Sequence, residues 1–308
     1  MNRMTVKDFA ISFGTGVFDI IDKCGDIIDR YPLLYELFKR RSRDNIIIKI
    51  LEYIDQDTQK IASSERTNVW HNGWQENLDA FIRNNGDLEL LTPKFVRPNQ
   101  PLRWEQGYIK AEDPWMELRF YEIFRQWVFK TYFSDVDNTY EFGCGTGYNL
   151  VALSKLFPNM NLYGSDFVQS SVDLVNNISA VHFLNVAGYL FDMIKPDSSI
   201  KLKKNSGVYT IGAIEQLGGK FNNFIHYLID NKPKIVVHIE PTIELYDLNI
   251  LEDYLAYKFH KKRGYTIGLL PYLQQLDREK IIKLEKVQRT YFGSLYMEGY
   301  NLIVWRPL

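Results

Sequence analysis

The spacing of hydrophobic residues changes near residue 134, and this change predicts two parts of the chain. Over residues 1–65 apolar side chains recur three and four positions apart, which is typical of helices that bury one face. Residues 66–113 mix Pro, Gly, Trp and Arg, and predict helix fragments and ordered loops. We therefore expect residues 1–133 to form a mainly helical region that lies against the rest of the chain.

One long helix is predicted at the end of this region. The apolar positions of residues 115–133 follow the helical period. Asp113 and Pro114 precede it, and this pair is typical of a helix cap and first turn.

From residue 134 onward, short apolar runs alternate with helical patterns. Strands are predicted over 138–142, 161–167, 185–193, 206–214 and 234–241, and then over 281–292 and 300–308. Helices are predicted over 147–157, 170–184, 220–231 and 248–264. Strands separated by helices indicate a parallel sheet, whereas the closely joined last pair must be antiparallel. The predicted fold class is α/β, with a mostly parallel sheet whose last strand is reversed.

Composition excludes several classes of protein. Hydrophobic residues make up 45% of the 308-residue chain, enough to bury a sizeable core. The chain has 37 basic and 38 acidic side chains, so its charge indicates no nucleic-acid partner. The two cysteines, Cys24 and Cys144, predict neither a disulfide framework nor a zinc cluster, which favours a reducing, cytoplasmic setting and no metal site.

The first residues do not predict a signal peptide or a membrane anchor. Asp8, Asp19 and Asp22 interrupt the apolar part of this segment, and no uncharged run is long enough to span a bilayer. We expect no membrane partner. The apolar helices near the N-terminus are equally suited to capping their own domain or to pairing two copies as a homodimer.

The segment EFGCGTG, residues 141–147, follows the first predicted strand of the sheet. Glycines at such a turn allow a ligand to approach the main chain closely, and the next helix presents free backbone N–H groups there. Gly143, Gly145 and Gly147 are evenly spaced by two, unlike the glycines of the dinucleotide fingerprint. A plain tight turn would also explain this triplet.

Acidic residues end the next two predicted strands. Asp166 is placed to accept both hydroxyls of a ribose at the mouth of the sheet, or to cap the following helix. Asp192 is placed to contact the exocyclic amino group of an adenine, or to form a surface turn before Pro196.

Together the run from Glu141 to Gly147, Asp166 and the reversed last strand resemble the class I S-adenosylmethionine-dependent methyltransferases. The resemblance covers residues 134–308, and EFGCGTG matches the first motif of that family closely. It implies a Rossmann-like methyltransferase domain over 134–308, with S-adenosylmethionine as cofactor. Residues 1–133 would then form the cap that closes over the cofactor and selects the substrate.

The resemblance also implies roles for individual residues. The glycine loop, with Cys144, would run under the methionine part of the cofactor, and Glu141 would help to orient its amino group. Asp166 would bind the ribose, with Phe167 near the adenine. The adenine edge would meet Asp192, with Met193 beside it.

The segment GAIEQLG, residues 212–218, resembles a Glu-His segment found in many small-molecule members of the family. Gln216 stands where those relatives carry the histidine, so a base that some of them use is absent here. Glu215 would face the cofactor or substrate, or else begin a helix.

Methyl transfer from a sulfonium mainly requires alignment, and an oxygen acceptor also needs its proton removed. His238 and Glu240 end a predicted strand on the same side, so we expect them to act as base and orienting carboxylate. The alternative for His238 is a hydrogen-bonded histidine in the core.

Aromatic and basic residues of the N-terminal region are the candidates for binding the substrate. Trp70, His71 and Trp74 cluster in NVWHNGW, and Arg103 lies in a Pro-rich loop. Such side chains suit a sugar, an aromatic ring or a carboxylated small molecule. Packing between the two parts of the chain is the alternative.

These observations favour a methyltransferase that acts on a small molecule, at oxygen rather than nitrogen, in a role such as tailoring a sugar or natural product. The alternatives are a protein methyltransferase and a non-catalytic module that binds the cofactor. A nicotinamide-dependent oxidoreductase is disfavoured by the glycine spacing.

Overall fold

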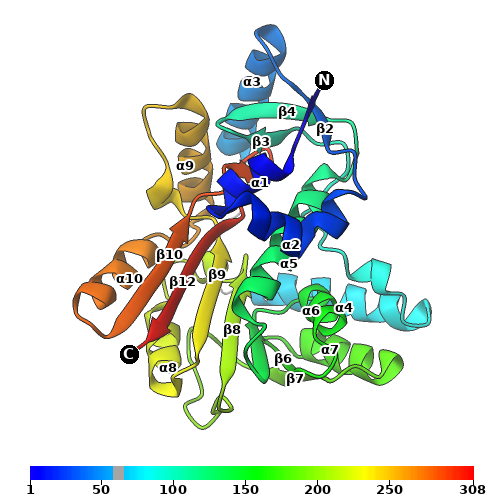
Figure 1. The fold of residues 1–308 in the computed structure, drawn as a ribbon, viewed down its shortest axis with the longest axis vertical. Coiled ribbons are helices and arrows are strands. Elements are labelled where there is room, and N and C mark those ends of the chain that lie inside the picture. Colours follow the sequence, from blue (N-terminus) through cyan, green and yellow to red (C-terminus); the bar gives the residue numbers. More distant parts are fainter. Residues whose placement is uncertain (58–65) are drawn as a thin grey trace.

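The computed structural model describes residues 1–57 and 66–308, and at its centre is a seven-stranded sheet (Figure 1). The strand order is β10-β12-β9-β8-β5-β6-β7. The strands are β5 (Asn138–Phe142), β6 (Asn161–Asp166), β7 (Val186–Leu190), β8 (Ser206–Ile211), β9 (Ile235–Glu240), β10 (Ile282–Gln288) and β12 (Asn301–Pro307). Each lies within a segment that the hydrophobic pattern predicts to be a strand.

Four neighbouring pairs in this sheet are parallel, so the predicted α/β class with a mostly parallel sheet is confirmed. Strand β12 runs antiparallel to both of its neighbours, β9 and β10. The reversed strand therefore lies inside the sheet, one position from the edge formed by β10. A closely joined final pair requires opposite directions, but it does not determine which strand takes the edge.

Helices connect the strands and cover the sheet. They are α6 (Tyr148–Leu156), α7 (Gln169–His182), α8 (Asn222–Asn231), α9 (Leu251–Arg263) and α10 (Leu269–Arg278), with short 3₁₀ turns η2 (Ile214–Leu217) and η3 (Ile243–Leu245). The sequence pattern did not predict α10. Its Pro271 lies in the first turn, where a helix does not need the missing N–H.

The N-terminal region contains the predicted helices. They are α1 (Val6–Phe13), α2 (Val17–Ile28), α3 (Arg41–Gln56), α4 (Arg66–Arg83) and α5 (Met116–Tyr132). The 3₁₀ turn η1 (Leu88–Leu91) follows α4. Helix α4 is continuous where fragments were predicted. The part of the first helical pattern over residues 58–65 lies outside the described residues. Among the described residues, no helix has both the length and the hydrophobicity needed to cross a membrane.

A second, smaller sheet adds strands to residues 1–133 that the hydrophobic pattern did not predict. Its order is β1-β2-β4-β3-β11, with β1 (Asn2–Arg3), β2 (Leu34–Leu37), β3 (Leu102–Trp104), β4 (Gly107–Ala111) and β11 (Phe292–Gly293). These strands are too short for a period of two to stand out in the sequence. Glu105 and Gln106, with φ of 48° and 63°, form the tight turn between β3 and β4.

The second sheet also crosses the predicted domain boundary, because β11 comes from the C-terminal part of the chain. The side chains beneath the second sheet also pack across this boundary. Phe120 of α5 stacks on Phe292 of β11, with ring centroids 3.7 Å apart, and belongs to one core cluster with Phe13 and Val237. The division into residues 1–133 and 134–308 therefore stays a prediction, and the packing is continuous across it.

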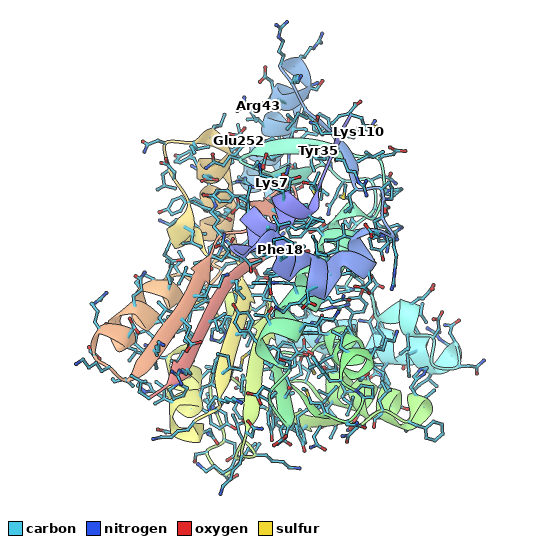
Figure 2. All side chains as sticks on the ribbon, in the orientation of Figure 1. Lys7, Phe18, Tyr35, Arg43, Lys110 and Glu252 are labelled. Atoms are coloured by element: carbon cyan, nitrogen blue, oxygen red, sulfur yellow. The ribbon has the colours of Figure 1, made fainter. Side chains whose placement is uncertain are left out.

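Buried charges hold the second sheet against the main one. Arg103 of β3 donates to Asp253 of α9 at 3.0 Å, and Arg289 donates to the same carboxylate oxygen at 2.6 Å. Arg289 also pairs with Glu298 at 2.7 Å. All four side chains are buried. A partly exposed pair extends this contact, because Arg43 of α3 donates to Glu252 at 2.7 Å (Figure 2).

We predict that Asp253→Asn lowers the free energy of unfolding by about 3–5 kcal/mol, because it leaves two buried guanidinium groups without their shared carboxylate. Urea denaturation would measure the change. The control is Asp135→Asn, which removes the exposed pair with Lys234 and should cost at most about 1 kcal/mol. Equal losses in the two variants would contradict this account of the cluster.

Candidate functional site

The candidate site lies at the edge of the sheet where the parallel strands end. Strand β5 has β6 on one side and β8 on the other, so the chain changes direction across the sheet at β5. In open α/β sheets, ligands bind outside the carboxyl ends of the strands at such a switch point. The loop of residues 143–147 leaves β5 there and enters α6.

The three loop glycines have left-handed conformations, with φ of 74° at Gly143, 52° at Gly145 and 73° at Gly147. A side chain at Gly143 would also collide with Ala213, whose Cβ lies 2.5 Å from the position of an added Cβ. The loop is anchored to β6, because the N–H groups of residues 143 and 144 donate to Ser165 O at 2.8 and 3.0 Å. Glycine is therefore required by conformation as well as by space.

Asp166 joins the glycine loop to the next helix. Its buried carboxylate accepts the Gly145 N–H at 3.1 Å and the Val168 N–H at 3.3 Å. Burial raises the pKa of Asp166 to about 6, and the backbone hydrogen bonds oppose that rise. Asp166 is not the N-cap of α7, because that position is Val168, and the bond from the Val168 N–H to Asp166 forms a turn just before the helix. The ring of Phe167 beside it is 45% exposed.

Glu141 is inside the core, so it does not face the open edge directly. Its carboxylate accepts the Asn149 side-chain N–H at 2.7 Å and the Tyr209 hydroxyl at 3.1 Å. Burial raises the pKa of Glu141 to about 8. The role of Glu141 in orienting a ligand amino group stays a prediction, and from this buried position it would act through water or through its neighbours. The residue holds β5, β8 and the first turn of α6 together.

Residues after β7 contribute one buried and one exposed side chain. Met193 is buried, and its terminal carbon lies 3.5 Å from the position of a Cβ added to Gly143. Asp192 is exposed and accepts the Ile194 N–H at 2.8 Å, which is the surface-turn arrangement. Both residues follow β7, at the edge of the sheet where the candidate site lies.

Cys144 of the glycine loop is buried, with its sulfur 3.6 Å from the Ser171 hydroxyl.

Helix α4 lies against the glycine loop through Trp74. Two atoms of the Trp74 indole lie 3.0 Å from the position of a Cβ added to Gly145. Trp70 stacks on Trp74 with ring centroids 5.4 Å apart. The carbonyl oxygen of His71, whose side chain is exposed, accepts the Ser170 hydroxyl at 3.1 Å. Of these three residues, Trp74 contacts the loop, Trp70 packs on Trp74, and His71 contacts α7 through its main chain.

Arg103 does not belong to this group. It is 1% exposed and donates to Glu252 O at 2.6 Å and to Asp253, within the buried charge cluster. A role in contacting the substrate is therefore corrected to a role in joining the two sheets. The sequence could not separate these roles, since the Pro-rich loop gave no sign of a strand.

His238 is not accessible as a catalytic base. Its ring is fully buried, with Nδ1 2.9 Å from the Thr210 hydroxyl and the Trp305 ring 6.2 Å away between centroids. Thr210 donates its only hydroxyl hydrogen to Glu240 at 2.8 Å, so His238 Nδ1 must be the donor to Thr210. Burial lowers the pKa of His238 to about 3. His238 is therefore a hydrogen-bonded histidine in the core, which was the alternative to a catalytic base.

Glu240 fixes the main chain that follows β8. Its carboxylate accepts the N–H groups of Ala213, Ile214 and Glu215, each at 3.1 Å. Burial raises the pKa of Glu240 to about 7, and these bonds oppose the rise. The predicted orienting carboxylate is thus a cap for η2. The partly exposed Glu215 is the catalytic candidate nearest to solvent, with its side chain accepting Gln216 Nε2 at 2.6 Å.

Three residues of this site were not predicted. Asn149 and Tyr209 hold Glu141, and Thr210 links His238 to Glu240. Tyr209 is the register partner of Glu141, and Thr210 is the register partner of His238. Only the strand order and register identify Tyr209 and Thr210, because their residue types alone carry no such signal. Within 1–57 and 66–308, no group of three His, Cys, Asp or Glu side chains could hold a metal ion.

No protein-family model matches the chain, and no curated protein matches it. Similar solved structures include the [4+2]-cyclase SpnF, with 12% identity, a TM-score of 0.49, and coverage of 69% of this chain and 88% of that one. A SAM-dependent methyltransferase from Aquifex aeolicus has 15% identity and a TM-score of 0.40, over 60% of this chain and 89% of that one.

A third similar structure is the O-methyltransferase NcsB1 from neocarzinostatin biosynthesis, in complex with S-adenosylmethionine and 2-hydroxy-5-methyl naphthoic acid. Its identity is 10% and its TM-score 0.42, and the match covers 63% of this chain and 58% of that one. At these identities and TM-scores, none of the three carries a function over to this chain. The strand arrangement itself is the mostly parallel sheet that the resemblance to class I methyltransferases implied.

We predict that Glu141→Gln flattens the dependence of stability on pH. The folded protein holds a proton on Glu141 up to about pH 8, whereas the unfolded chain releases it near the ordinary value of 4.5. The contribution of Glu141 to the free energy of unfolding is therefore largest below pH 4.5. It falls as the pH rises toward 8, by up to about 1.4 kcal/mol per pH unit. Denaturation at pH 5, 6 and 7 would measure it.

The matched control is Glu279→Gln, which changes an exposed carboxylate. Its pH dependence should follow that of the unaltered protein. A Glu141→Gln variant with the same pH dependence as the unaltered protein would show that Glu141 is ionised in the core.

Proposed function

We propose that this chain is an S-adenosylmethionine-dependent methyltransferase that acts on a small molecule, at oxygen rather than nitrogen. The observation that carries the proposal is the glycine loop at the switch point, with three left-handed glycines and the Asp166 carboxylate bonded to it. Main chain of this kind suits a ligand that must lie close to the backbone. The acidic neighbours disfavour a phosphate.

The residues at this edge fit the proposed cofactor. Gly143, Gly145 and Gly147 would support the methionine part, and Asp166 would accept the ribose hydroxyls. Phe167 and Asp192 are exposed beside the loop and would contact the adenine. Trp74 now lies on Gly145, so binding requires α4 to shift or the indole to turn.

When bound, the cofactor supplies a methyl group on a positively charged sulfur. The protein's part is to align the acceptor with that group and to exclude water, and such alignment can supply roughly 7–11 kcal/mol. Trp70 and Trp74 provide an apolar cover for this purpose. Because His238 and Glu240 lie in the core, Glu215 is our candidate to take a proton from an oxygen acceptor.

A second candidate function is binding of the same cofactor without turnover. The specific observation in its favour is that the predicted base and its carboxylate are both used inside the structure, with His238 fully buried and Glu240 capping η2. Turnover measurements with hydroxylated small molecules would separate an enzyme from a sensor.

A homodimer through the N-terminal helices also stays a proposal. Its support is a set of exposed apolar side chains on α1 and α2, namely Ile11, Phe18 and Ile21, which are 64%, 87% and 50% exposed (Figure 2 labels Phe18). Sedimentation of the protein and of a Phe18→Ser variant would test it.

We predict that Asp166→Ala weakens binding of S-adenosylmethionine at least about tenfold, or 1.4 kcal/mol, because the ribose hydroxyls lose their acceptor. Isothermal titration calorimetry would measure the affinity. Asp230→Ala, at an exposed position on α8, is the control and should bind normally. If Asp166→Ala folds and binds as tightly as the unaltered protein, the ribose assignment is wrong.

We further predict that S-adenosylmethionine changes the fluorescence of Trp74, because the indole must leave Gly145 or acquire a new neighbour. The change should be lost in Trp74→Phe and retained in Trp115→Phe. Calorimetric binding with an unchanged Trp74 signal would show that the cofactor binds elsewhere.

A further inference from the structure

A groove runs along helix α5, on a part of the protein that the proposed cofactor site does not use. Its volume is about 810 Å³, and it is lined by side chains of α2, η1, α5 and α6. We call it the α5 groove. Arg125 and Glu122 of α5, Tyr148 and Lys155 of α6, and Trp115 at the start of α5 line it.

Arg125 is a buried cation in the wall of this groove. Its side chain is 6% exposed, and its guanidinium lies over the Tyr148 ring at 4.3 Å and the Tyr121 ring at 5.1 Å. One N–H donates to Asn149 at 2.9 Å. A guanidinium has five N–H donors. The flanking rings and Asn149 therefore hold the group in one orientation with donors to spare.

The neighbouring carboxylate does not neutralise Arg125 by direct pairing. Glu122 accepts from Tyr31 at 3.0 Å, from Tyr148 at 3.3 Å and from Arg119 at 3.4 Å. Among the described residues, no carboxylate lies within ion-pairing distance, 4.0 Å, of Arg125 or of the exposed Lys155. These two cations are thus available to an anion in the groove.

The groove is also lined by charged side chains of both signs, namely Asp26, Arg30, Glu89 and Arg119, and by rings that suit a flat ligand. Trp115 is 37% exposed, Tyr31 and Tyr148 are partly exposed, and the apolar side chains of Leu118 and Val151 lie between them. Aromatic side chains favour planar ligands through stacking, and an arginine fork favours a carboxylate because both its oxygens can be bound at once.

We propose that the α5 groove is a binding site for a small planar aromatic carboxylate, held by Arg125 and Lys155 and covered by Trp115 and Tyr148. The inference goes beyond the proposed function and does not depend on it, since none of these residues contacts the glycine loop's proposed ligand. The groove is close to that loop in sequence, because Tyr148 directly follows Gly147.

The test compares trans-cinnamate with its neutral analogue cinnamamide by calorimetry on the full chain. We expect cinnamate to bind at least about tenfold more tightly, as a charge-assisted fork implies. Arg125→Gln should abolish that preference, and Lys155→Gln should weaken cinnamate binding about two- to threefold. Lys283→Gln, an exposed lysine on β10, is the matched control and should change nothing.

Because Arg125 is buried, the Arg125→Gln variant could lose stability. A second measurement therefore tests the site without that variant. Nuclear Overhauser effects between cinnamate protons and the Trp115 indole should appear in the unaltered protein and vanish in Trp115→Phe. Absence of cinnamate binding at millimolar concentration, equal binding of the two probes, or contacts outside the groove would each overturn the proposal.

A titration with S-adenosylmethionine on the same sample keeps the two proposals separate. Cinnamate binding without cofactor binding would remove the proposed function and leave the groove assignment. Cofactor binding without cinnamate binding would remove the groove assignment and leave the proposed function.

Discussion

Three carboxyl groups buried at the ends of parallel strands determine how this edge of the sheet is built. Glu141, Asp166 and Glu240 are each almost fully buried, and a buried carboxyl group without hydrogen-bond donors would cost several kcal/mol. Each finds its donors on a neighbouring element: Asn149 of α6, the loop N–H of Gly145, and the N–H groups before and within η2. The requirement to satisfy them fixes the loop after β5, the start of α7 and the segment after β8.

This constraint explains why the site was only partly predictable. The strands, the glycine loop and the acids at the strand ends follow from hydrophobic runs and from residue types that occupy few backbone conformations. Whether an acid faces a ligand or the core depends on cross-strand register, which places Tyr209 opposite Glu141 and Thr210 opposite His238. The predicted strand does carry His238 and Glu240, but nothing in the residue pattern indicates how deeply the two side chains are buried.

The N-terminal region was harder to predict for a different reason. Its helices have long amphipathic patterns and were found, whereas the strands of the second sheet are two to five residues long. Arg103 looked like a ligand-binding residue in a Pro-rich loop, but β3 carries it into a cluster with Asp253. Trp70 and Trp74 were candidates for binding the substrate or for packing the two parts together, and Trp74 lies against Gly145 of the loop.

The pairing of β11 with β3 has a consequence for biosynthesis. Strand β1 begins at residue 2 and β11 ends at residue 293, so one small sheet gathers segments from nearly the whole polypeptide. During synthesis β3 therefore has an unpaired edge until residues 292–293 have emerged from the ribosome. Contacts this distant along the chain slow folding, and an open strand edge is a template for wrong association. The core beneath the N-terminal helices can therefore close only after β11 has been made, because Phe292 of β11 is part of it.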